Sequence, residues 1–188
     1  MARPILGLRR CVLIFAAFAA ATASGQRSSV AECAPDGSAA VPPAQQGGVR
    51  EFERQVKSGP FYKELTRRFG TPEACKTTLD DGNINLSFTY HGDARLNAKM
   101  DSRIEFTEQR AQLSGMSEKS GIALLKQAEA NAFGTHGCGI VWKAPAETIA
   151  GERAGSHEAV YQGDTCNCQA RVIYEGSSVV GLVLSSAC

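Results

Sequence analysis

Cysteines that remain after a removable export signal place the strongest constraint on how this chain can fold. Arginines near the start precede an apolar run from Val12 to Ala21, and Ala21-Thr22-Ala23 is a small-x-small site of the kind that signal peptidase cleaves. The apolar run is too short to span a bilayer. We therefore expect a signal peptide over residues 1–23 and a soluble exported protein, periplasmic or secreted.

Removal of that signal also removes Cys11 and leaves an even number of cysteines: Cys33, Cys75, Cys138, Cys166, Cys168 and Cys188. An even number in an oxidising compartment predicts that all of them pair as disulfides. The pairing pattern must then limit which strands and helices can lie next to one another.

Alternation on the last two expected strands predicts one of these pairs. Val172 and Leu182 belong to the apolar sets and are expected to face each other across a loop over Gly176-Ser177-Ser178. The same register sets Tyr174 opposite Val180 and Cys166 opposite Cys188. By elimination, we pair Cys138 with Cys168 and Cys33 with Cys75.

The overall charge excludes one class of partner. The 20 Lys and Arg residues balance the 19 Asp and Glu residues to a formal net charge of +1, and the expected signal removes only basic residues. No basic tract remains, which argues against nucleic acid binding. No apolar run after residue 23 is long enough to cross a membrane, so we expect no integral membrane segment.

The mature chain begins with a segment of low hydrophobicity. Residues 24–48 are rich in Ser, Ala, Pro, Gln and Gly, a composition that buries too little apolar surface to offset the entropy of ordering. We predict a flexible leader there, held only if Cys33 is bridged, and a single folded domain over residues 49–188.

Helix signals open that domain and recur in its middle. Phe61, Leu65 and Phe69 follow helical spacing, with Pro60 suited to the first helical position and Gly70 to the position after the helix. Ser117 is a candidate N-cap for a second helix that ends near Phe133.

Strand patterns follow each helix. Residues 83–112 alternate polar and apolar side chains with turns at His91-Gly92-Asp93 and Asp101-Ser102-Arg103, which predicts an antiparallel meander. Further strands are expected near residues 139–142, 157–162, 165–175 and 179–186. We therefore predict an α+β fold in which helices pack on an antiparallel meander sheet and disulfides crosslink the structure.

A short pattern that recurs in the sequence suggests that a helix-plus-meander unit occurs twice. Phe69-Gly70-Thr71 precedes Cys75, and Phe133-Gly134-Thr135 precedes Cys138, which gives possible halves 49–115 and 116–188. The alternative is a single α+β domain without duplication. Tandem helix-plus-sheet units resemble, in architecture only, the β-lactamase-inhibitory proteins, which are small exported binding proteins. No motif of that family occurs, so no residue roles carry over.

Catalytic motifs are absent from the sequence: no Gly-x-Ser-x-Gly, His-Glu-x-x-His, P-loop or dinucleotide pattern occurs. The alternative function is a small envelope hydrolase, whose catalytic histidine would be His136, close to Cys138 in the sequence, or His157. Cys166-x-Cys168 with one of these histidines would suit copper(I) or zinc, although the second ligand pair usual for structural zinc is missing. We therefore expect a binding protein rather than an enzyme, with no cofactor and no metal.

The polar face of the first meander is the best candidate binding surface. Its members, together with one aromatic anchor from elsewhere in the chain, are Asn85, Ser87, Arg95, Asn97, Lys99, Glu105 and Trp142. Tyr161 and Phe61 are further candidate anchors, and the expected register sets Asn85 opposite Lys99 and Lys99 opposite Glu105. One interpretation is a plain solvent face with cross-strand pairs. The other is a docking surface for a protein partner. The chain itself would then be an inhibitor, an immunity-type protein or an envelope accessory module.

Overall fold

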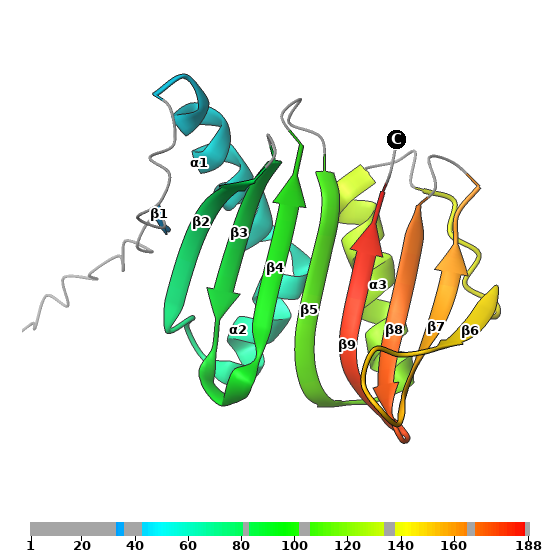
Figure 1. Cartoon of the computed structure of the whole chain (residues 1–188). Coiled ribbons are helices and arrows are strands. Elements are labelled where there is room, and N and C mark those ends of the chain that lie inside the picture. The colour runs from blue at the N-terminus through cyan, green and yellow to red at the C-terminus, as the bar shows by residue number, and fades with distance from the viewer. Residues whose placement is uncertain are drawn as a thin grey trace, which may run out of the picture. The chain divides into compact units, whose positions relative to one another are not determined.

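A single curved sheet with helices on one of its faces forms the body of the protein (Figure 1). The computed structural model describes residues 33–35, 43–80, 83–101, 106–133, 138–164 and 168–186. Its helices are α1 (Pro43–Ser58), α2 (Pro60–Phe69) and α3 (Glu118–Phe133). Its strands are β1 (Ala34–Pro35), β2 (Ala74–Asp80), β3 (Asn83–Thr89), β4 (Arg95–Met100), β5 (Phe106–Met116), β6 (Glu147–Ala150), β7 (Ser156–Gln162), β8 (Gln169–Glu175) and β9 (Ser178–Ser185).

The order of these strands shows a helix-plus-meander unit that occurs twice. Within the sheet the order is β1-β2-β3-β4-β5-β9-β8-β7-β6. Helices α1 and α2 precede the meander β2–β5, which we call the first half, and α3 precedes the meander β6–β9, the second half. The last strands of the halves, β5 and β9, pair antiparallel in the middle of the sheet. The α+β fold class predicted from the sequence is therefore confirmed.

Local signals in the sequence explain where two of the helices begin and end. Pro60 occupies the first turn of α2, and Gly70 ends that helix with a φ of 83°, a conformation that favours glycine. The hydroxyl of Ser117 accepts a hydrogen bond from the backbone N–H of Ser120 at 3.3 Å, so Ser117 caps α3 as predicted.

The core lies between the helices and one face of the sheet. Strands β3 and β4 alternate buried apolar residues with partly exposed polar ones, and the buried set contacts α1 and α2. Helix α3 packs on β8 and β9 of the second half and on β5 of the first half. The fully buried large side chains include Phe61, Leu65, Leu86, Phe88, Leu96, Met100, Leu125, Leu182 and Leu184.

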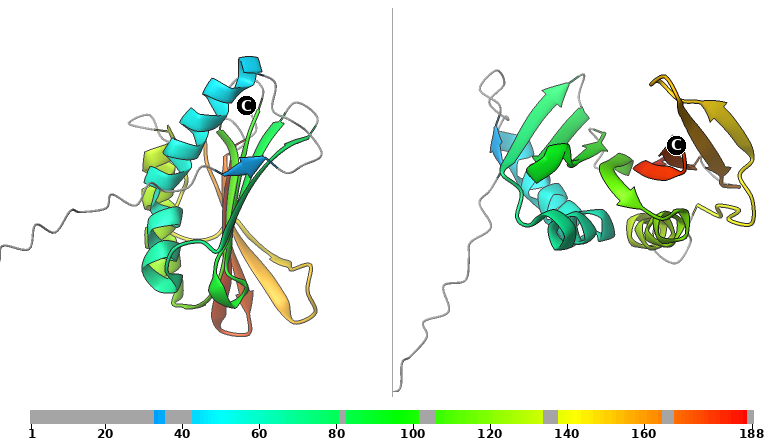
Figure 2. Two further views of the ribbon diagram at one scale, coloured as in Figure 1. Left: turned by 90° about the vertical axis from the view of Figure 1, so that its left-hand side faces the viewer. Right: turned by 90° about the horizontal axis from the view of Figure 1, so that it is seen from below.

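The other face of the sheet carries none of the described helices, and we call it the open face. Seen end-on in Figure 2, the sheet curves away from the helices toward both of its edges, so that the open face is concave. The face that contacts the helices is called the helix face below. Because side chains on a strand alternate, each strand contributes every second residue to the open face.

Two of the predicted disulfides are present. Cys33 is bonded to Cys75 with their Cα atoms 4.8 Å apart, and Cys138 is bonded to Cys168 with a Cα separation of 5.7 Å. Each half of the fold contains one of these bonds. The third predicted pair, Cys166 with Cys188, lies outside the described residues. Disulfides of this kind are typical of proteins that fold outside the cytoplasm.

Part of the expected leader is folded, and the prediction made its order depend on a bridge at Cys33. We expected a flexible leader over residues 24–48, yet α1 begins at Pro43 and β1 pairs with β2 at Ala34 and Pro35. The physical reason is the anchor at Cys33. Its disulfide bonds it to β2, and its backbone N–H donates to the buried carboxylate of Glu53 at 3.2 Å.

The register between the last two strands confirms the prediction only in part. Val172 lies opposite Leu182 as expected, but Tyr174 lies opposite Val179 rather than Val180. A register shift between Ile173 and Tyr174 accounts for the difference. Because of this shift, the loop after Glu175 is shorter than the three residues that we predicted.

None of the helices in the described part of the chain is both long enough and apolar enough to cross a membrane.

Candidate functional site

Most of the residues predicted for a binding surface do share the open face. Asn85 lies opposite Lys99, and Ser87 lies opposite Asn97, which is the expected register. Arg95 continues the same set opposite Thr89. Arg95 and Asn97 are exposed, and the other three side chains are partly exposed.

One predicted cross-strand pair is wrong. Lys99 lies opposite Glu108 on β5, not opposite Glu105, and Glu105 itself falls outside the described residues. The pairing of β4 with β5 shifts between Lys99 and Met100. The residues of β5 that face β4 therefore differ from those that the sequence pattern indicated.

Trp142 belongs to the helix side of the molecule and does not join the open face. Its indole Nε1 donates a hydrogen bond to Glu129 of α3 at 3.0 Å, and its ring lies 5.4 Å from the ring of Tyr161. Tyr161 and Phe61, which we also considered as aromatic anchors, are buried in the core. The open face therefore receives none of the three predicted anchors.

The open face is wider than the first meander, because the pairing of β5 with β9 continues it into the second half. The register can be followed laterally from strand to strand across the sheet. The central row reads Lys76, Ser87, Asn97, Arg110, Val183, Arg171, Val160 and Glu147. The sequence pattern did not indicate this continuation, since it contains no signal for which strands of the two meanders meet.

Charged side chains form a connected network in the middle of this face. Arg171 on β8 lies 3.3 Å from Glu158 on β7 and 3.9 Å from Glu108 on β5. Arg110 lies 3.8 Å from the same Glu108. Between the two arginines in the register, Val183 is fully buried although it belongs to the open face.

Part of this network is buried and incompletely bonded. The side chain of Glu158 is 9 % exposed and that of Arg171 is 25 % exposed. The Nε atoms of Arg110 and Arg171 are buried and have no hydrogen-bond partner among the described residues. A buried donor without an acceptor is uncommon in a folded protein and calls for an explanation.

The two halves of the open face differ in their charge. In the first half, basic side chains outnumber acidic ones: Lys76, Arg95, Lys99 and Arg110 against Asp80 and Glu108. In the second half, acidic side chains outnumber basic ones: Glu147, Glu158 and Glu175 against Arg171. The face is therefore polarised from one edge of the sheet to the other.

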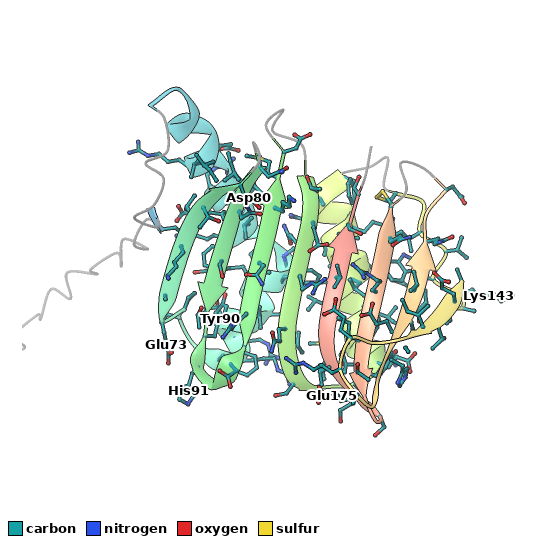
Figure 3. The ribbon with its side chains drawn as sticks, viewed as in Figure 1. Glu73, Asp80, Tyr90, His91, Lys143 and Glu175 are labelled. Atoms are coloured by element: carbon teal, nitrogen blue, oxygen red, sulfur yellow. A yellow bond between two sulfur atoms is a disulfide. The ribbon has the colours of Figure 1, made fainter. Side chains whose placement is uncertain are left out.

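A pocket of about 120 Å³ opens on this face within the second half. Its lining comes from β5, β7, β8, β9 and the turn between β6 and β7, and includes Arg110, Gln112, Glu152, Arg153, Glu158, Ile173, Glu175 and Gly181. Glu175, which is labelled in Figure 3, marks the end of the sheet where the pocket lies.

A second pocket, of about 310 Å³, lies on the helix face. It is lined by residues of α1, α3, β4 and β5, among them Phe52, Val56, Met100, Gln109 and Asn131. No charged side chain of the described residues is part of that lining, so the pocket offers shape but little electrostatic selectivity. Among the same residues, no histidine lines either pocket.

The histidines considered for catalysis lie elsewhere. The ring of His157 stacks on that of Tyr174 with their centroids 4.7 Å apart. Burial raises the pKa of the Tyr174 phenol, and the nearby carboxylate of Glu118 acts in the same direction. His157 therefore packs against a tyrosine of the core, while His136 falls outside the described residues.

The metal-binding alternative loses one of its ligands. Cys168 is bonded to Cys138 and so has no thiolate to offer a metal ion, and Cys166 is outside the described residues. Within the part of the chain that the structure describes, no group of three or more His, Cys, Asp and Glu side chains is close enough to hold a metal ion.

Comparison with known proteins returns no similar chain: no family model, no curated protein and no solved structure matches this sequence or its fold.

Proposed function

We propose that this chain is an exported binding protein whose concave open face docks on the convex surface of a protein partner. The observation that carries the proposal is the uncovered face itself, with its half-buried network of Arg110, Glu108, Arg171 and Glu158. A face that served only as a solvated surface would not need to bury these charges.

The arginines of this network support the same function. The side chains of Arg110 and Arg171 are 38 % and 25 % exposed, so a docked partner can reach them although their Nε atoms are buried. Arginine is enriched at the centres of protein interfaces, where its planar group pairs with carboxylates and backbone carbonyls. A partner that offers such groups to the terminal nitrogens of Arg110 and Arg171 would add charge-assisted hydrogen bonds.

The shape and polarity of the face favour a protein partner over a small molecule. A small ligand is usually enclosed in a deep, mainly apolar pocket, whereas this face extends across the strands of the sheet and carries charged side chains. Its opposite charges at the two ends suit a partner whose own surface is polarised in the reverse direction. The export signal expected over residues 1–23 and the two disulfides suggest that this partner lies in the periplasm or outside the cell. An inhibitor, an immunity-type protein and an envelope accessory protein would all fit this description.

Site-specific crosslinking tests the proposal. A photoreactive benzoyl-phenylalanine would replace Asn97 or Gln112 on the open face, and Lys63 or Lys119 on exposed helix positions as controls. After irradiation of the exported protein in its native envelope or medium, we expect one discrete adduct from the open-face positions and none from the helix positions.

A blocking substitution provides the matched control. Asn97→Arg places a large side chain on the open face and should reduce the adduct formed at Gln112 at least tenfold. Gln127→Arg introduces the same side chain at an exposed position of α3 and should leave that adduct unchanged. Adducts that form equally from both faces, or none from the open face, would refute the proposed docking surface.

A further inference from the structure

The pocket on the helix face lies between the helices of the two halves. Figure 2 shows α1 with α2 as one group and α3 as another, both against the same face of the sheet. The pocket, of about 310 Å³, is lined by Phe52 and Val56 of α1, Ala132 of α3 and Met100 of β4. A cavity of about 150 Å³ in another protein is enough to hold benzene, so this pocket has room for a larger ligand.

One buried side chain of this pocket is polar. Gln109 lines it from β5 and is only 8 % exposed. The neighbours of Gln109 across the sheet are Ala98 on β4 and Leu184 on β9, which are both buried and apolar. Farther along β5, the buried positions Ala111 and Leu113 are apolar too. Gln109 is therefore a polar exception at a core position.

The amide of Gln109 is unpaired within the described part of the chain. Its side chain makes no hydrogen bond to any residue that the structure describes. Its amide atoms are not among the polar atoms that are sealed from solvent, so they meet the pocket rather than packed protein. A buried amide costs free energy unless it finds a hydrogen-bond partner. The unused donor and acceptor of Gln109 thus indicate that a polar group enters the pocket.

The rim of the pocket is polar but uncharged. Gln55, Ser58 and Asn131 are exposed there. Gln55 donates to Glu51 at 3.1 Å, and the hydroxyl of Ser58 donates to the backbone carbonyl of Gln55. Asn131 of α3 reaches the junction of α1 and α2, where a Cβ atom on Gly59 would lie 3.7 Å from its Nδ2. Because no charged side chain of the described residues lines the pocket, an ionised ligand would enter without a counter-charge.

We propose that this pocket binds an uncharged small molecule with an apolar body and a carboxamide-like group. The apolar body would pack on Phe52, Val56 and Met100, and the polar group would pair with the amide of Gln109. A carboxamide fits because it offers a donor and an acceptor side by side, as Gln109 does. The site lies on the face opposite to the proposed docking surface and does not depend on it.

Three probes of nearly equal shape test the chemistry of the site. Hydrocinnamamide has a phenyl body and a carboxamide, hydrocinnamate has a carboxylate instead, and benzylacetone replaces the NH₂ group by a methyl group. Side-chain amide signals of Gln109 and the methyl signal of Met100 are followed by NMR in the full-length protein with its disulfides intact. We expect saturable shifts with a dissociation constant in the millimolar range for hydrocinnamamide, and at least fivefold weaker binding of hydrocinnamate.

Gln109→Met isolates the role of the amide, because methionine keeps the length of the side chain and removes both hydrogen-bonding groups. Hydrocinnamamide should bind this variant at least fivefold more weakly, whereas benzylacetone should bind it equally well or more tightly. The urea midpoint of the variant without ligand should not fall, since an unpaired buried amide is replaced by an apolar group.

Two further variants locate the binding. Gln112→Met makes the same change on the opposite face of β5, where Gln112 pairs with Arg95, and should leave the binding of both probes unchanged. Ala132→Phe fills the pocket from a partly buried position of α3 and should abolish the binding of both.

Several outcomes would overturn the assignment. Shifts that do not saturate would mean that the pocket holds only water, and equal binding of hydrocinnamate would mean that it does not select an uncharged group. An equal effect of Gln109→Met on hydrocinnamamide and benzylacetone, or a fall in its urea midpoint, would show that the amide is not free to bind a ligand. None of these results bears on the crosslinks at Asn97, so the docking surface is tested separately.

Discussion

The carboxylate of Glu129 on α3 accepts a hydrogen bond from the backbone N–H of Cys138 at 3.1 Å. The first half contains the same relationship, since Glu53 on α1 accepts a hydrogen bond from the backbone N–H of Cys33 at 3.2 Å. In both halves that cysteine is one end of a disulfide. In each half a glutamate thus connects the disulfide to a helix. Cys33 precedes its helix α1 in the sequence, whereas Cys138 follows its helix α3.

Replacement of Glu129 should loosen the segment that follows α3. Besides Cys138, its carboxylate holds the backbone N–H of Ile140 and the indole N–H of Trp142. We expect Glu129→Ala to lower the free energy of unfolding by about 2–4 kcal/mol, because it leaves these donors without their acceptor. Emission from Trp142, the single tryptophan, should shift to longer wavelength in the folded variant as its ring gains water contact.

Glu53→Ala is the control for that experiment. It removes the corresponding acceptor in the first half and should also lower stability, but it should leave the emission of Trp142 unchanged. Identical emission spectra for Glu129→Ala and the native protein would contradict the role of Glu129.

Loss of the second-half disulfide should destabilise the fold. Cys138 and Cys168 are 30 residues apart in the sequence, and a crosslink of that span restricts the unfolded chain. We expect Cys138→Ser with Cys168→Ser to lower the free energy of unfolding in urea by about 2–4 kcal/mol. The pair Cys33 and Cys75, with a separation of 42, should give a similar loss when replaced. A loss below about 1 kcal/mol for either pair would argue against the chain-entropy account.

The remaining cysteine pair stays a prediction of the sequence. Cys166 and Cys188 were paired on a register that sets Val172 opposite Leu182, and that part of the register is confirmed. Peptide mapping of the unreduced protein should yield one crosslinked fragment that contains both cysteines. Recovery of either cysteine as a free thiol, or joined to a different cysteine, would contradict the pairing.

Stability should fall at high pH because of buried tyrosines, and Tyr90 is one of them. Burial raises the pKa of Tyr90 to about 12, whereas an unfolded tyrosine titrates near pH 10. Between about pH 10 and pH 12 the unfolded chain releases a proton that the folded chain keeps, so the stability present below this range is lost as the pH rises. A tenfold difference in proton affinity between the two states corresponds to about 1.4 kcal/mol of stability.

Tyr90→Phe tests this directly. The buried hydroxyl of Tyr90 has no hydrogen-bond partner at ordinary geometry in the described part of the chain, so its removal should be neutral or slightly stabilising at pH 7. Urea unfolding at a series of pH values should show a shallower loss for the variant between about pH 10 and pH 12 than for the native protein. Equal slopes would show that other groups carry the alkaline instability.

The sequence predicted the elements whose side chains alternate clearly. On β3 and β4 every second residue is apolar and buried, so the strands, the turn at His91-Gly92-Asp93 and their register could all be read from the pattern. Strands β2 and β6 carry no such pattern. In β2 the buried residue is the polar Thr77, and all residues of β6 are exposed, so neither strand has an apolar set to reveal it.

The candidate site was predictable only where it coincided with that pattern. Asn97 and its neighbours were found because they alternate with core residues. The network of Arg110, Glu108, Arg171 and Glu158 depends on β5 meeting β9, a pairing between residues far apart in the sequence. The pocket of this face is lined by four strands and a turn that come together only in the folded sheet.

The two edges of the sheet are unequal. One edge is formed by β1, a two-residue strand in which Pro35 has no backbone N–H to offer a further strand. The opposite edge is β6, which is the last strand in the order and is exposed throughout. Assembly of copies into a fibril requires an edge that can accept a strand at each end. Among the described strands, β6 is exposed along its whole length, whereas β1 interrupts the opposite edge beside Lys76 and Thr77. Strand addition is therefore hindered at one end of the sheet, which disfavours growth into a fibril.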